Sequence, residues 1–61
     1  MDSKYIEAYE AILTAEKEIA IAKRELTRGD SPYVSLSVAR NQCDRAMSLW
    51  HATKEKELNE D

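Results

Sequence analysis

Only one short stretch of this chain contains residues that break a helix. Gly29 is the single glycine and Pro32 the single proline among 61 residues, and both stand in RELTRGDSPY, residues 24–33. On either side the chain is rich in Ala, Glu, Lys, Ile and Leu, which favour helices. The sequence therefore predicts two long helices joined by one turn.

The residues around this break match the signals that end one helix and begin another. Gly29 is the usual residue type at a left-handed C′ position. Asp30 or Ser31 can cap the next helix, and Pro32 suits its first turn, where a missing N–H costs nothing. We expect one domain over 1–61, with a first helix at about 3–28, a turn at 29–32, a second helix at about 33–57 and a frayed tail at 58–61. A turn this short makes the helices antiparallel, so the predicted fold is all-α, an antiparallel two-helix coiled-coil hairpin.

Arg28, Gly29 and Asp30 also spell an Arg-Gly-Asp triplet. As an adhesive ligand the triplet would need an exposed loop on a secreted protein. The first ten residues, MDSKYIEAYE, contain no apolar segment of the signal-peptide kind. The single cysteine, Cys43, fits a reducing compartment. We therefore expect a cytoplasmic protein and interpret the triplet as the hinge of the hairpin.

Charge and composition exclude several function classes. Nine Lys and Arg against twelve Asp and Glu give a net charge of −3, which does not attract polyanions, so we expect no nucleic-acid partner. No run of 18 apolar residues occurs, so we expect no membrane partner. Cys43 and His51 lie on one predicted helix roughly 12 Å apart, too far to act as a catalytic pair. We expect no enzyme activity, no metal site and no cofactor.

The length of the chain limits its stability when alone. Below roughly 70–80 residues a single core rarely supplies more than about 3–5 kcal/mol. One cysteine excludes an internal disulfide. Association, with another protein or with a second copy, is the remaining source of stabilisation. We expect the isolated chain to be marginally stable or self-associated.

Heptad spacing indicates which residues of each helix face the other helix. In the first predicted helix, large apolar residues recur every seven positions and alanines interleave with them, as in a coiled-coil seam. The second helix offers a matching stripe that also includes Ala39 and Ala46, and folding at the turn places small residues opposite large ones. The predicted seam consists of Tyr5, Ala8, Ile12, Ala15, Ile19, Ala22 and Leu26 with Leu36, Cys43, Met47 and Trp50.

Further apolar residues lie outside this predicted seam. One row repeats every seven positions about 100° round the first helix, and the second helix carries a patch of its own. Two helices alone cannot cover these surfaces, and rows at helical spacing indicate a protein contact. The predicted partner-binding residues are Ile6, Tyr9, Leu13, Ala20, Val34, Val38 and Leu49. Arg40 and Arg45 flank the patch of the second helix and either rim the contact or are solvated.

Three segments resemble a known family. They are AKRELTRG at 22–29, Tyr33, which opens the second helix, and CDRAMSLW at 43–50. Together they are similar to the small E-type co-chaperones of type III secretion needle subunits, the YscE/PscE/AscE group, over roughly residues 12–50. The turn is shorter here, and Cys43 stands where that family has leucine. The corresponding residues are Arg24, Glu25, Leu26, Arg28, Gly29, Tyr33, Cys43, Asp44, Ala46, Met47 and Trp50.

The resemblance implies a cytoplasmic co-chaperone of a Gram-negative secretion system. Such a hairpin would bind a tetratricopeptide-like G-type protein, and the pair would hold the needle subunit soluble and unpolymerised. A needle subunit polymerises through its own amphipathic helices, so premature assembly is blocked while a groove covers them.

Two other hairpin classes remain as alternatives. A homodimeric four-helix bundle of the plasmid-copy-control type binds RNA through a basic face, but Lys4, Lys17 and Arg24 interleave here with acidic residues. Response-regulator phosphatase hairpins carry a Ser-Gln-Glu-Leu-Asp-like motif. The aligned residues 40–44 read RNQCD here, and only Asp44 matches.

Overall fold

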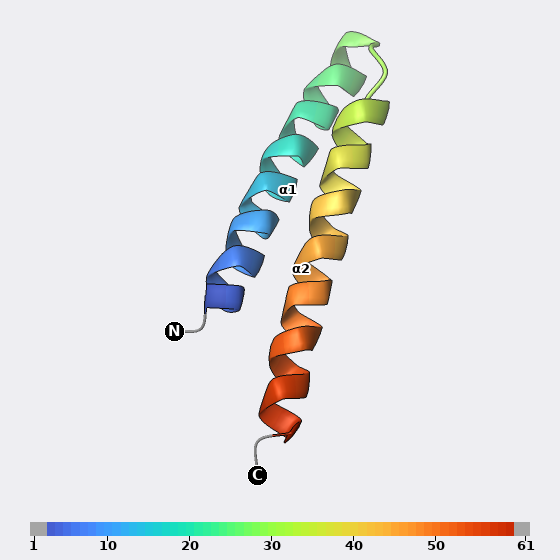
Figure 1. Ribbon diagram of the computed structural model, residues 1–61. Coiled ribbons are helices and arrows are strands. Elements are labelled where there is room, and N and C mark those ends of the chain that lie inside the picture. Colours follow the sequence, from blue (N-terminus) through green and yellow to red (C-terminus); the bar gives the residue numbers. More distant parts are fainter. Residues whose placement is uncertain (1–2, 60–61) are drawn as a thin grey trace.

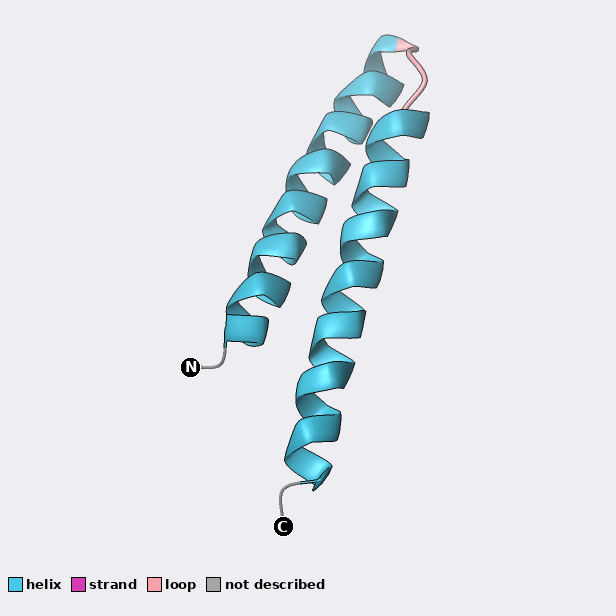
Figure 2. Cartoon of the chain, in the orientation of Figure 1, coloured by secondary structure: helices cyan, strands magenta, loops and turns pink. Residues whose placement is uncertain are grey.

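The chain folds as a hairpin of two long helices. The computed structural model describes the backbone of residues 3–59 and the side chains of residues 3–54. Helix α1 (Ser3–Arg28) and helix α2 (Tyr33–Asn59) run antiparallel and pack along their shared length (Figure 1). Figure 2 shows that the only loop among these residues is the connection at the top of the hairpin. The predicted all-α hairpin is confirmed.

Helix α2 extends two residues beyond its predicted end near 57. The predicted frayed tail at 58–61 thus begins inside this helix, and its last two residues lie outside the part of the chain that the structure describes. Over that part, neither helix has an apolar stretch that could cross a membrane.

Gly29 ends α1 in a left-handed conformation, with φ at +82°. Its N–H donates to the Leu26 carbonyl at 3.1 Å, and the N–H of Asp30 donates to the Glu25 carbonyl at 2.8 Å. This pair of hydrogen bonds is a Schellman motif, which satisfies carbonyls at the end of α1. Asp30 therefore closes the first helix through its backbone.

Ser31 and Pro32 lie directly before α2. The Ser31 hydroxyl accepts a hydrogen bond from the Tyr33 N–H at 3.3 Å, and the Pro32 carbonyl accepts one from the Leu36 N–H at 2.9 Å. Just beyond, the Ser35 hydroxyl donates to Glu25 Oε1 at 2.6 Å, which ties α2 to α1 beside the turn.

The two helices meet along a row of small side chains, which we call the alanine seam. Its buried residues are Ala8, Ala11, Ala15 and Ala22 of α1 with Ser35, Ala39, Ala46 and Thr53 of α2. Small residues on both sides allow two helices to approach closely. The Thr53 hydroxyl is satisfied by the Leu49 carbonyl at 3.0 Å, so this polar group is buried without loss of a hydrogen bond.

The structure corrects the predicted seam for its large members. Ala8, Ala15 and Ala22 are buried, but the larger residues assigned with them are all exposed: Tyr5, Ile12, Ile19, Leu26, Leu36, Cys43, Met47 and Trp50. Each helix is turned so that its small residues face the other helix. Large side chains between the helices would hold them apart, and the alanines would lose their contacts.

Candidate functional site

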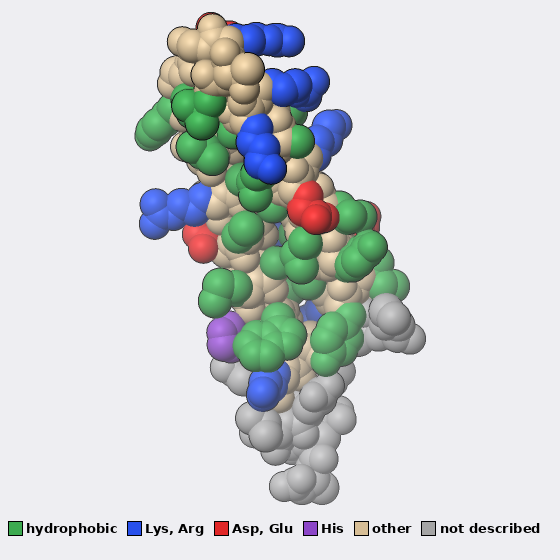
Figure 3. All heavy atoms as spheres, turned by 180° about the vertical axis from the view of Figure 1, so that it is seen from behind, with side chains coloured by type: hydrophobic (Ala, Val, Ile, Leu, Met, Phe, Trp, Pro, Cys, Tyr) green, Lys and Arg blue, Asp and Glu red, His purple; other side chains and the backbone are tan. Residues whose placement is uncertain are grey.

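The large residues displaced from the seam lie on one side of the hairpin, along both helices, and we call this side the apolar face. Tyr5, Ile12 and Ile19 repeat every seven positions along α1, so they lie on one side of that helix. On α2 the same spacing joins Leu36 to Trp50. In full, the apolar face contains Tyr5, Ile12, Ile19 and Leu26 with Leu36, Cys43, Met47 and Trp50. Figure 3 shows this side, where hydrophobic side chains of both helices follow the length of the hairpin.

A shallow groove of about 360 Å³ lies in the apolar face near the open end of the hairpin. Ile12 is 47% exposed there and Trp50 46%, so each keeps about half of its surface in contact with water. The groove is lined by Tyr5, Ala8, Tyr9, Ile12, Ala46, Met47 and Trp50. A groove between two apolar helix edges suits an apolar side chain or helix of another chain.

Trp50 is held by two neighbours on its own helix. The ring of His51 meets it edge-on, with centroids 4.9 Å apart, and Lys54 Nζ lies 5.1 Å from the centre of the Trp50 ring. These contacts orient the indole, yet its exposed half still faces the groove. Tryptophan in such a position is typical of residues that anchor protein contacts.

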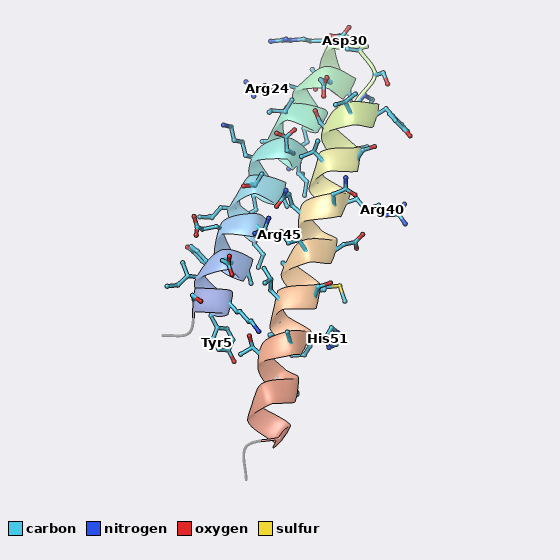
Figure 4. The ribbon with its side chains drawn as sticks, viewed as in Figure 1. Tyr5, Arg24, Asp30, Arg40, Arg45 and His51 are labelled. Carbon is cyan, nitrogen blue, oxygen red and sulfur yellow. The ribbon has the colours of Figure 1, made fainter. Side chains whose placement is uncertain are left out.

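Each helix carries a row of residues along the outer edge of the apolar face, and we call these rows its two rims: Tyr9, Glu16 and Lys23 on α1, and Tyr33, Arg40 and Met47 on α2. Glu16 follows Ile12 by four positions and precedes Ile19 by three, so it lies beside them on α1. Arg40 stands in the same relation to Leu36 and Cys43 on α2, and Figure 4 shows it pointing away from α1. Among the described residues, neither Glu16 nor Arg40 forms an ion pair within the hairpin.

The opposite side of the hairpin is polar. A hollow of about 270 Å³ lies there between the helices and is lined by Glu7, Glu10, Ala11, Thr14, Gln42 and Arg45. Figure 4 shows that the Arg45 side chain points toward α1. Its Nη2 atom lies 4.0 Å from Glu7 Oε1. Both side chains are about half exposed, so this ion pair contributes little to stability.

The predicted partner-binding residues do not form one surface. Ile6, Leu13 and Ala20 lie exposed along the outer side of α1, and we call them the outer row. Tyr9, 63% exposed, lies between the outer row and the groove. On α2, Val34 is exposed but Val38 is half-buried, and Leu49 packs against Ala8, Ala11 and Ala46. Leu49 therefore contributes to the hairpin's own packing, and its predicted contact with a partner stays a prediction.

Cys43 is exposed on the apolar face rather than buried against alanines, which corrects its predicted place in the seam. No three His, Cys, Asp or Glu side chains within the described residues are grouped so that they could hold a metal ion.

The chain matches no family model, no curated protein and no solved structure.

Sequence reasoning missed Ala11, Ser35 and Thr53 as seam residues. A signal for the first was present, because Ala8, Ala11 and Ala15 follow a spacing of three and four positions. That spacing competed with Tyr5, Ala8 and Ile12, which follow the same rule with larger side chains. Ser35 and Thr53 carried no apolar signal, since their burial depends on hydrogen bonds to Glu25 and to the Leu49 carbonyl.

Proposed function

We propose that this hairpin is a protein-binding subunit rather than an enzyme. The observation that carries the proposal is the apolar face, a surface of large hydrophobic side chains that runs along both helices and is left uncovered by the hairpin's own packing. Contiguous apolar surfaces of this kind mark protein contacts, and covering one is favourable by about 25 cal/mol per Å².

We propose further that it is the cytoplasmic E-type co-chaperone of a type III secretion needle subunit. The resemblance of AKRELTRG and CDRAMSLW to that family supports this, and the hairpin has the architecture that the family's role requires. Trp50 and Met47 of the second segment lie in the groove of the apolar face. The segment that carries the resemblance therefore also supplies part of the candidate contact.

The distribution of apolar residues on α1 favours a concave partner. The apolar face includes Ile12, the outer row includes Leu13, and Tyr9 joins the two surfaces round the helix. A flat partner would cover only one of these sides, whereas a groove would cover both. Helical-repeat proteins of the tetratricopeptide type present such concave surfaces. The G-type protein would accept α1, and the pair would then cover the needle subunit.

Co-expression tests this function. The chain is expressed with the G-type protein and the needle subunit of a type III secretion system from the same genome, and soluble complexes are purified and weighed by light scattering. We expect one stable complex of all three chains. Leu13→Glu should abolish it while helicity is retained, because Leu13 is exposed and contributes nothing to the alanine seam.

Asn41→Glu is the matched control, because it adds the same charge at an exposed polar position of α2. We expect this variant to bind like the unaltered chain. Absence of a complex with either protein would refute the co-chaperone function. A needle subunit that stays soluble and unpolymerised without this chain would refute it as well.

A further inference from the structure

We propose that a second copy of this chain covers the apolar face, so that two hairpins form a four-helix bundle about a two-fold axis that runs along the helices. In this arrangement α1 of each copy lies on α2 of the other. The homodimer would use the same apolar face as the proposed contact with another protein, so the two complexes would be alternative ways of covering it, and the experiments below measure the chain alone.

The first step compares the height of residues on the two helices, meaning their position along the long axis of the hairpin. Ala8 and Ala11 of α1 pack in one cluster with Ala46 and Leu49 of α2, which places the middle of the first pair level with the middle of the second in the antiparallel hairpin. Counting along both helices from that level, Glu16 and Arg40 stand at one height to within about one residue. The same count places Lys23 and Tyr33 at one height. Tyr9 and Met47 also lie at one height, because both line the groove. Each pair lies on opposite rims of one face.

A two-fold axis along the helices places the α1 rim of one copy on the α2 rim of the other. The rotation leaves the height of every residue unchanged. Glu16 of one copy then meets Arg40 of the second copy, and symmetry makes the same contact a second time. Lys23 meets the ring of Tyr33, a cation–π contact, and the ring of Tyr9 meets the sulfur of Met47. All three rim contacts are favourable.

The other way to place two faces together uses an axis across the helices, which lays α1 on α1 and α2 on α2. Glu16 lies at the middle of α1 (Ser3–Arg28), so it would then meet Glu16 of the second copy. Arg40 would likewise meet Arg40. Like charges opposed on both rims disfavour this arrangement. The charge pattern therefore selects the axis along the helices.

The size of the face fits a stable dimer. The apolar face runs from Tyr5 to Leu26 along α1, which is about 32 Å at the rise of an α-helix. The large residues of this face are each left exposed by the hairpin, so a second copy laid along it would cover all of them together, as in interfaces that bury about 800 Å² per partner. Rows such as Ile12 and Ile19 would then form the interior of the bundle.

A charge swap tests the arrangement. Sedimentation equilibrium of the unaltered chain should show a dimer. Glu16→Lys and Arg40→Glu should each raise its dissociation constant by about tenfold, because each opposes like charges twice. The double variant should restore the dissociation constant to within about threefold, because the pair is re-formed with its signs exchanged.

Glu10→Lys and Arg24→Glu are the controls, since they make the same changes of charge away from the apolar face. Both should leave the dissociation constant within about threefold of the original. A monomer at all accessible concentrations would overturn the inference. The arrangement about this axis would be overturned if the single variants left the dissociation constant unchanged. It would also be overturned if the double variant dimerised as weakly as the single variants.

Cys43 supplies a second readout, as the only cysteine of the chain. It is exposed on the apolar face of a single hairpin. Its rate of alkylation by a maleimide should fall as the protein concentration rises through the dissociation constant. A dimer in which Cys43 reacts at the monomer's rate would be formed through another surface and would overturn the inference.

Discussion

The two sides of α1 use hydrophobic residues in opposite ways. Toward α2 it presents Ala11 and Ala15, which are almost completely buried, whereas Ile12 and Ile19 beside them keep more than 40% of their surface exposed. Burial of a large aliphatic side chain contributes about 1.5–3 kcal/mol, and burial of an alanine much less. The hairpin therefore closes on its small residues and leaves its large hydrophobic side chains exposed.

The two broad sides of the hairpin differ just as clearly. The apolar face carries a groove around Met47 and Trp50, while the opposite hollow is lined by Glu7, Glu10 and Arg45. One side is suited to being covered and the other to facing water. The contact proposed above would use this difference, because it covers the apolar side and leaves the polar side in water.

Replacement of a seam alanine by a larger residue should lower the stability of the hairpin more than any other change considered. Ala15→Leu places a side chain where the helices meet, and Ala15 is only 3% exposed. We expect a loss of about 1–3 kcal/mol in the free energy of unfolding, measured by urea denaturation at one protein concentration. Leucine and alanine have similar helix propensities, so the loss reports packing.

Ala20→Leu makes the same change on the exposed outer row and should alter the free energy of unfolding by less than about 0.5 kcal/mol. Equal effects of the two variants would contradict the distinction between the seam and the outside of α1.

Gly29→Val should cause the second-largest loss of stability. No atom lies within 4 Å of the position that a Cβ would take, so the cost is conformational and arises from the φ of +82°. We expect a loss of about 1–2 kcal/mol in the same denaturation experiment. Gly29→Asn should cost less, because asparagine tolerates the left-handed region better. A valine variant as stable as the original would show that the turn does not require this conformation.

Ser35→Ala removes the hydrogen bond that ties the helices beside the turn. Its hydroxyl donates to Glu25 Oε1 at 2.6 Å in a partly buried position. We expect a loss of about 1 kcal/mol in thermal unfolding followed by circular dichroism. Ser48→Ala, at an exposed position of α2, should leave the unfolding temperature unchanged. If both variants unfold alike, the contact does not hold the helices together.

Arg45→Ala should have the smallest effect. Its contact with Glu7 is long and exposed on the polar side, so we expect a change below about 0.5 kcal/mol, with no added sensitivity to salt. A large loss in denaturation experiments at low salt would show that the polar side contributes to holding the hairpin, contrary to the contrast drawn above.

The architecture was predictable because a few local signals determine it. Gly29 and Pro32 are the only strong helix breakers, and the Schellman hydrogen bonds at Gly29 depend on a residue type that sequence alone identifies. The all-α hairpin follows from these positions and from a connection too short for any other arrangement.

The rotation of the helices about their own axes was not predictable in the same way. Ala8 and Ala15 can form a seam with Ile12 on one side or with Ala11 on the other, and both choices satisfy coiled-coil spacing. Hydrophobicity favours Ile12, whereas close approach of two helices favours Ala11. The buried Ser35 lies opposite the end of α1 through its bond to Glu25, a long-range contact that heptad spacing does not encode.

Fluorescence quenching of Trp50 by acrylamide, measured across a dilution series, tests the central claim most directly. Trp50 is the only tryptophan and lies half exposed in the groove of the apolar face. The account predicts strong quenching in dilute solution, and weaker quenching at concentrations where the second copy is bound, with helicity unchanged. Weak quenching at dilutions where sedimentation shows a monomer would place Trp50 inside the hairpin, and strong quenching at concentrations where sedimentation shows a dimer would leave its face uncovered. Either result would contradict the account.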